Sequence, residues 1–226
     1  MRCLPVIAGA LAAAVVSMPV WAINMNKPRV SVDLKSGGRY SDAIVIDNPG
    51  RDEVQVRVYY EDFEYKEPYT ADKEFFPPYS SGHSLAGGIS YSPQEFVLPP
   101  YGSQRIDFML EAPADFSTAR CGVLFFETSM GGGFDSSGKA VQLLSRVGTL
   151  FFMQPAGVAA DADLQDVTGG TGAITATLVN TGKRFIKPTG SYYVMDARSM
   201  AVDRGSVDVR FLMPGAKAQV TIPVPS

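Results

Sequence analysis

The chain has 226 residues, of which 46% are hydrophobic and 19% charged, and its formal net charge is −3. This slightly acidic balance argues against a nucleic-acid-binding protein and leaves no polybasic patch for a membrane surface. One histidine and two cysteines are too few for a His/Cys metal site, so neither a metal nor another cofactor is expected.

Residues 1–22 are predicted to be a secretory signal peptide. Arg2 supplies the basic region, Leu4–Val20 is apolar and alanine-rich, and Val20–Ala22 fits a small-residue cleavage site. Cleavage would make Ile23 the first residue and leave enough chain for two domains of about 100 residues each. The alternative, an uncleaved membrane anchor, is less favoured because the apolar run is near the lower limit for a span. We therefore expect an exported protein of the periplasm.

Only Cys121 remains after cleavage, which excludes an internal disulfide in an oxidising compartment. A free cysteine at the start of a strand is expected to be a buried small hydrophobe. The alternatives are an intermolecular disulfide or a reactive thiol. His83 lies between Gly82 and Ser84 and is expected to be exposed to solvent and inert.

From residue 29 onward the chain shows short alternating or β-branched runs bounded by turn residues, a pattern typical of a β-sandwich. The first predicted strands are Arg29–Leu34, Asp42–Asp47 and Val54–Tyr60. Asn48-Pro49-Gly50 is a strong turn signal between the second and the third. These two strands are therefore expected to pair as a hairpin.

Residues 61–91 are too long for a tight turn and are expected to form an irregular excursion at one end of the sandwich. Their aromatic side chains are expected to pack down as a lid, the alternative being a contact surface. They are Tyr65, Tyr69, Phe75, Phe76 and Tyr79. Glu61, Asp62 and Glu64 are interpreted as a solvated face, with a weak calcium site as the alternative.

Three further blocks of predicted strand follow in a fixed order: Ser92–Leu110, Cys121–Thr128 and Val141–Gln154. Between the last two, the glycine-rich segment Met130–Lys139 is expected to be a flexible hairpin tip. It is not a phosphate-binding loop, because no Gly-Lys-Ser/Thr follows and no helix begins there.

Residues 157–226 are predicted to form a second unit of the same kind. One sequence pattern is shared by Leu98–Ile106 and Leu212–Val220: a turn with proline and glycine is followed by a glutamine and then by a strand. This internal similarity indicates two copies of one sandwich. Only one strand follows the turn in the second copy. Either that domain lacks its last strands, or a partner supplies them, or the chain is truncated.

The three blocks, in this order, resemble the N-terminal immunoglobulin-like domain of periplasmic pilus-assembly chaperones of the PapD-like type. The resemblance covers nearly the whole mature chain and is best over residues 29–58 and 92–157. It implies an all-β fold of two immunoglobulin-like sandwiches, residues 23–156 and 157–226, the C-terminal one abbreviated.

The resemblance also implies a function. Chaperones of this family lend an edge strand to a pilus subunit whose own sandwich lacks its last strand. The implied partners are pilin-like or other secreted subunits, with an outer-membrane usher as a further candidate. The implied donor strand is Val141–Gln154, with a free edge over residues 141–153. Its predicted partner-binding residues are Val141, Leu143, Val147, Thr149 and Phe151. The same face could equally be the domain's own core.

The family's carboxylate anchor is a first-strand arginine and a late donor-strand lysine, but the corresponding positions here hold Ser31 and Thr149. Arg29 and Arg146 are the candidates to replace them. A proline at Val147 is expected to remove a ladder N–H and to abolish strand addition, and the alternative outcome is that it unfolds the domain.

No catalytic residues are predicted. A Ser/His/Asp triad would have to use His83, and the sequence has no Gly-x-Ser-x-Gly elbow. The alternative to a chaperone is an exported structural or adhesive immunoglobulin-like module that uses residues 61–91 as its contact surface.

Overall fold

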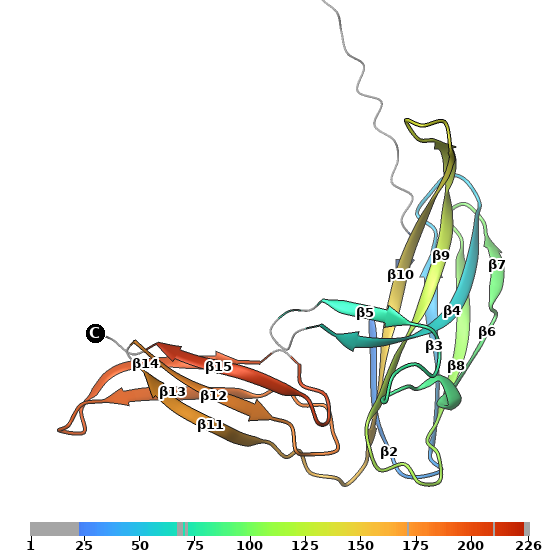
Figure 1. The fold of residues 1–226 in the computed structure, drawn as a ribbon. Coiled ribbons are helices and arrows are strands. Elements are labelled where there is room, and N and C mark those ends of the chain that lie inside the picture. Colours follow the sequence, from blue (N-terminus) through green and yellow to red (C-terminus); the bar gives the residue numbers. More distant parts are fainter. Residues whose placement is uncertain (1–22, 67–69, 71, 171, 210, 224–226) are drawn as a thin grey trace, which may run out of the picture.

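The computed structural model describes residues 23–66, 70, 72–170, 172–209 and 211–223, so the expected signal peptide lies outside the described part. The described residues form strands β1 to β15 and one short 3-10 turn, η1 (Ala86–Gly88). The all-β prediction is confirmed (Figure 1).

The first domain is a sandwich of two sheets. One sheet contains, in spatial order, β1 (Asn24–Met25), β3 (Arg39–Asp47), β8 (Ser103–Glu111) and β6 (Ile89–Ser92). The other contains, in order, β2 (Arg29–Leu34), β10 (Ala140–Pro155), β9 (Arg120–Phe134), β4 (Val54–Tyr65) and β5 (Lys73–Phe76), with β7 (Glu95–Leu98) also paired to β4.

The core of this domain lies between the two sheets, because each strand turns alternate side chains inward. On β8, Ile106, Phe108 and Leu110 are buried, whereas Arg105 before them and Asp107 between them are exposed. The facing sheet contributes buried side chains in the same way; they are Val30, Val56, Val58, Leu124, Phe126, Phe151 and Met153. The alternation visible in the sequence therefore corresponds to one buried and one exposed face.

The predicted hairpin between the second and third strands is wrong. β3 pairs with β1 and β8, whereas β4 pairs with β9, β5 and β7 in the opposite sheet. The turn between them crosses from one sheet to the other. Asn48 is buried there and donates from Nδ2 to Asp52 O (2.8 Å) and Pro99 O (3.0 Å), and Gly50 N donates to its Oδ1 (2.9 Å). A side chain held in this way fixes the crossing.

Residues 61–91 are more regular than expected. β4 continues to Tyr65 and forms a hairpin with β5, in the register Asp62↔Phe76 to Tyr65↔Lys73. Tyr65 and Phe75 pack against a buried aromatic cluster, whereas Tyr79 is 74% exposed. Tyr69 lies outside the described residues.

Asp62 is not part of a solvated face, because it is fully buried. Its Oδ1 accepts hydrogen bonds from the hydroxyls of Tyr60 (2.6 Å) and Ser84 (2.7 Å), and its Oδ2 accepts from the amides of Ser80 (2.8 Å) and Ser81 (3.0 Å). The carboxylate therefore holds the loop before η1 against β4. Both of its oxygens already accept donors from the protein, which disfavours the calcium alternative.

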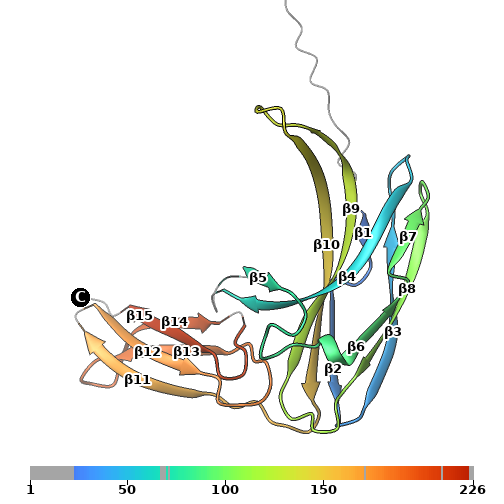
Figure 2. The same cartoon turned by 45° about the vertical axis from the view of Figure 1, so that its right-hand side comes forward.

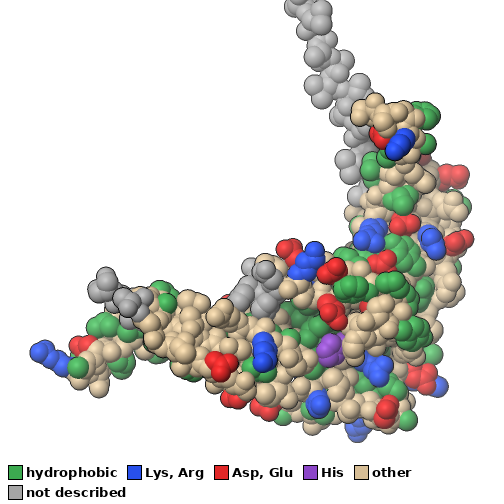
Figure 3. Space-filling model, viewed as in Figure 1, with side chains coloured by type: hydrophobic (Ala, Val, Ile, Leu, Met, Phe, Trp, Pro, Cys, Tyr) green, Lys and Arg blue, Asp and Glu red, His purple; other side chains and the backbone are tan. Residues whose placement is uncertain are grey.

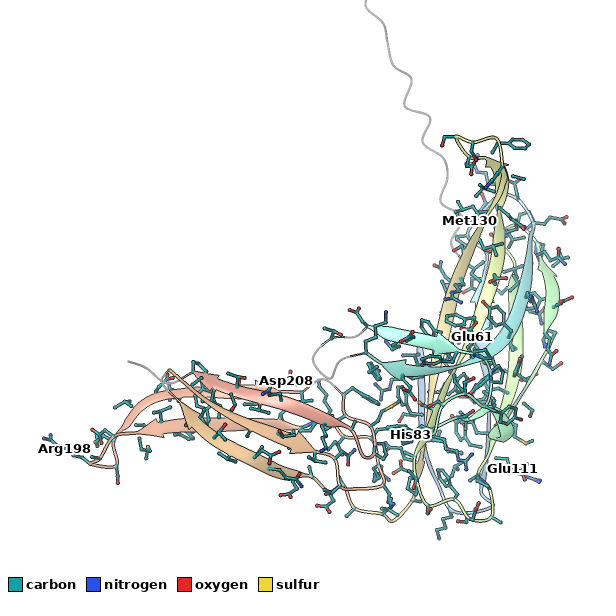
Figure 4. All side chains as sticks on the ribbon, viewed as in Figure 1. Glu61, His83, Glu111, Met130, Arg198 and Asp208 are labelled. Atoms are coloured by element: carbon teal, nitrogen blue, oxygen red, sulfur yellow. The ribbon has the colours of Figure 1, made fainter. Side chains whose placement is uncertain are left out.

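Cys121 is fully buried, as expected, and burial raises the pKa of its thiol, which keeps it protonated. His83 differs from the expectation because it is only half-exposed. Its ring lies 6.3 Å from that of Phe185 in the second domain, and its Nδ1 is buried with no hydrogen-bond partner in the described chain. Figures 3 and 4 show it at the junction of the domains.

The second domain is smaller. β11 (Asp163–Gly170), β12 (Ala173–Val179) and β15 (Lys217–Pro223) form a three-stranded sheet, and β13 (Thr189–Met195) and β14 (Ala201–Asp208) form a two-stranded one. This domain extends sideways from the lower end of the first (Figures 1 and 2). The two domains thus form an L, with the first domain as its upright arm and the β9–β10 hairpin at the top of that arm (Figures 1 and 2).

Aromatic rings join the two arms. The Phe152 ring on β10 lies 5.8 Å from Phe63 in its own domain, and 5.4 Å from Phe185 and 5.2 Å from Phe211 in the other. Arg184 adds a paired contact from Nη2 to both carboxylate oxygens of Asp33, at 3.0 and 2.9 Å. Buried rings and this ion pair, in which Nη2 alone donates to both carboxylate oxygens, together hold the angle between the domains.

Candidate functional site

The β9–β10 hairpin is longer than the sheet that supports it. β4 pairs with β9 only from Val123 to Thr128, whereas β9 continues to Phe134. Beyond Thr128 the two long strands pair with each other, and the upper part stands out as a two-stranded ribbon (Figure 1). Figure 4 shows Met130 on this ribbon, away from the second domain.

One edge of β10 is open over much of its length. β2 runs parallel to β10 only along Leu150–Pro155. From Ala140 to Thr149, β10 has β9 on one side and no strand on the other within the described part of the chain. The predicted free edge over 141–153 is therefore too long, because β2 covers its last part.

The open edge ends where the N-terminal segment comes alongside. Leu150 N donates to Pro28 O at 3.0 Å, and the Thr149 hydroxyl donates to Lys27 O at 2.7 Å. Leu150 thus turns its N–H away from β9. Since successive residues of a strand direct their backbone groups to opposite sides, Leu144, Arg146 and Gly148 turn theirs to the same open side. Unpaired N–H and C=O groups in a row are a template for a further strand.

The predicted partner-binding residues fall into two groups. Val141 is 47% exposed and Leu143 is 59% exposed, both on the ribbon, and Leu144 beside them is 49% exposed. Figure 3 shows hydrophobic side chains on this ribbon. Their contact with a partner stays a prediction.

The other three predicted residues serve the first domain itself. Phe151 and Thr149 are fully buried, and Val147 packs against the core. A period of two places all five residues on one face, but it does not show where the opposite sheet stops covering that face. The core interpretation therefore applies to the lower part of this face, and the contact-surface interpretation stays a prediction for its exposed upper part.

Arg29 and Arg146 lie in different surroundings. Arg29 begins β2 at the corner between the domains, with its guanidinium carbon 4.1 Å from the Phe152 ring centre and 5.9 Å from that of Phe211. It forms no ion pair with a described residue. Arg146 lies over the Phe125 ring at 4.4 Å and has Glu61 as its ion-pair partner at 3.6 Å.

A second cation lies near Arg29. Lys73 on β5 has its Nζ 4.9 Å from the Tyr65 ring centre, and the pKa of Lys73 is lowered, first by burial and also by the charge of Arg29. Asp72 acts on Lys73 in the opposite direction and raises its pKa, so this corner carries two cations and one anion. No sequence pattern pointed to Lys73, because its strand lies in a segment that was expected to be irregular.

The site offers backbone hydrogen-bonding groups, apolar side chains and positive charge. In the described part of the chain, no group of three or more His, Cys, Asp or Glu side chains could hold a metal ion. No helix among the described residues is long and apolar enough to cross a membrane. This arrangement suits the binding of another polypeptide.

No family model and no curated protein matches this chain. Several solved structures match this chain in fold. A chain from a chaperone–tip adhesin complex of CFA/I fimbriae aligns with a TM-score of 0.56 at 12% identity, covering 90% of this chain and 88% of that one. The class 5 fimbriae chaperone CfaA aligns with a TM-score of 0.56 at 13% identity, covering 87% and 84%. A chain of the Salmonella enterica SafA pilin–SafB chaperone complex aligns with a TM-score of 0.51 at 12% identity, covering 92% and 86%. The chain therefore has the two-domain, immunoglobulin-like fold of these fimbrial chaperones.

Proposed function

We propose that this protein is a periplasmic chaperone that binds subunits of a pilus or another surface appendage by β-strand addition and assists their folding and assembly. The observation that carries the proposal is the open edge of β10 from Ala140 to Thr149. The fold supports it, because solved chains with this fold include chaperones in complexes with a tip adhesin and a pilin. Removal of residues 1–22 on export, and an usher as a second partner, belong to the same proposal.

In this mechanism, main-chain hydrogen bonds give affinity and alternate side chains give selectivity. A strand of the subunit pairs with the outward backbone groups of Leu144, Arg146 and Gly148. Val141 and Leu143 enter the apolar groove that an incomplete sandwich leaves open. An exposed apolar surface on a projecting ribbon is the kind of surface that marks a protein contact. No catalysis is involved.

The first test is a pull-down of residues 23–226 from periplasmic extract, followed by mass spectrometry. We expect subunits with incomplete immunoglobulin folds. Val141→Asp combined with Leu143→Asp should reduce their capture at least tenfold, because each buries a charge in an apolar groove. Tyr101→Asp, at a residue that is 67% exposed outside the ribbon, is the control and should capture normally. Capture of only folded envelope proteins or polysaccharide would favour an adhesive module instead.

We further propose that Arg29, with Lys73 beside it, binds the C-terminal carboxylate of the subunit. The test uses a peptide of the captured subunit's C-terminal sequence, as the free acid and as the amide. The free acid should bind about tenfold more tightly, since a hydrogen bond to a charged group contributes about 1.5–3 kcal/mol. Arg29→Gln should remove this preference, whereas Arg105→Gln, on the other sheet, should keep it. Equal binding of acid and amide to the unaltered protein would refute the anchor.

A further inference from the structure

A row of alternating charges crosses the second sheet of the first domain. Glu95 on β7 is the cross-strand partner of Arg57 on β4, Arg57 is the partner of Glu127 on β9, and Glu127 is the partner of Arg146 on β10. Directly opposite residues of neighbouring strands lie on the same face of the sheet, and opposite charges in such pairs stabilise it. The signs therefore alternate from β7 across β4 and β9 to the open edge of β10.

The row of charges ends at Arg146, which has a cross-strand partner on one side only. Arg57 has an acidic residue on each side, and Glu127 has a basic residue on each side. Arg146 is the only charged residue of β10 and has an opposite charge on one side only. On its other side is the open edge, toward which its own backbone groups also point. A strand added there places one residue directly opposite Arg146.

The guanidinium of Arg146 can accept another partner. Its hydrogen bond to the Tyr59 hydroxyl (3.5 Å) and its ion pair with Glu61 Oε1 (3.6 Å) are both long and both use Nη1. Nε and Nη2 make no hydrogen bond with the residues that the structure describes. The Arg146 side chain is 43% exposed, and its guanidinium packs on the ring of Phe125.

We infer that the strand which adds to β10 carries an aspartate or glutamate opposite Arg146. This inference rests on the proposed function and specifies the partner of that site. The acidic residue would continue the row by one more pair. It lies on the outer face of the sheet, as Arg146 does. Val141 and Leu143 are an odd number of residues away from Arg146 and lie on the opposite face of β10, because the extra residue of the register shift between Gln142 and Leu144 belongs to β9.

The test uses three nine-residue peptides with capped ends. In each peptide, valine and threonine alternate at the odd positions. All even positions hold glutamate in the first peptide, glutamine in the second and lysine in the third, so that a shift of the peptide by two residues still places the same residue type opposite Arg146. The glutamate peptide should bind roughly three- to tenfold more tightly than the lysine peptide, the range expected for replacing a like-charge pair by an opposite-charge pair. The protein's net charge of −3 acts in the other direction, so this preference requires a local cation.

Arg146→Glu should reverse the preference, and Arg105→Glu, an equal change of net charge on the other sheet, should preserve it. Equal binding of the glutamate and lysine peptides, with loss of both in the Val141→Asp, Leu143→Asp variant, would overturn the inference and leave strand addition standing. An unchanged preference in Arg146→Glu would also overturn it. If none of the peptides binds, strand addition itself is contradicted, and the inference with it.

Discussion

Replacing Asp62 with alanine is expected to destabilise the first domain by about 3 kcal/mol or more, the largest effect on stability that we predict. The carboxylate is fully buried and accepts four hydrogen bonds, from two hydroxyls and two backbone amides. Burial and the neighbouring Asp62 both raise the pKa of Tyr60, which keeps this donor protonated. Truncation would leave the Ser84 hydroxyl and the amides of Ser80 and Ser81 without this acceptor, whereas the Tyr60 hydroxyl would keep only its longer hydrogen bond to Cys121 O (3.2 Å). Urea denaturation followed by circular dichroism gives the free energy of unfolding.

Asp62→Asn is the matched control. Its amide oxygen can still accept from Ser80 N and Ser81 N, and the hydroxyls of Tyr60 and Ser84 can rotate to accept from its NH₂ group. We expect it to lose about half as much stability as the alanine variant. If the alanine variant lost less than about 1 kcal/mol, the network would not be what holds the loop before η1.

The strands were predictable because burial follows a period of two. Ile44 and Ile46 on β3 and Ile106 and Leu110 on β8 are fully buried where the alternation places them. Pairing was less predictable. The Asn48-Pro49-Gly50 signal shows that the chain turns, but a turn between two strands of one sheet and a crossing between two sheets use the same residues. The side-chain bonds of Asn48 that decide the matter reach Pro99, far away in the sequence.

The position of the candidate site was predictable, but its limits were not. The long strand ending at Gln154 is visible in the sequence, as is its apolar face. The open edge ends at Thr149 because β2 pairs in parallel with Leu150–Pro155, a contact between segments more than 100 residues apart. The charged row needs the register of four strands, which no local pattern contains. Arg146 was singled out from its strand alone, and its place in the row could not be predicted.

Replacing Leu144 with proline is expected to reduce partner binding at least tenfold while leaving the free energy of unfolding within about 1 kcal/mol of the unaltered value. Leu144 turns its N–H to the open edge, so a proline there removes a donor that the partner needs and that the domain does not use. Its side chain is 49% exposed, which limits the loss of packing. The measurement is capture of the subunits recovered in the pull-down, together with urea denaturation.

Two variants make this result specific to the backbone. Leu144→Ala removes the same side chain but keeps the N–H, so it should bind more tightly than Leu144→Pro. Ser145→Pro removes an N–H that faces β9, where Ser145 lies opposite Thr128, and should destabilise the domain instead. The same reasoning applies to Val147, which also faces β9 through its backbone. A proline there would break the domain's own ladder, so unfolding of the domain would obscure the loss of strand addition. Full binding by a folded Leu144→Pro protein would show that the subunit does not pair with this edge, and attention would move to the side chains of the ribbon.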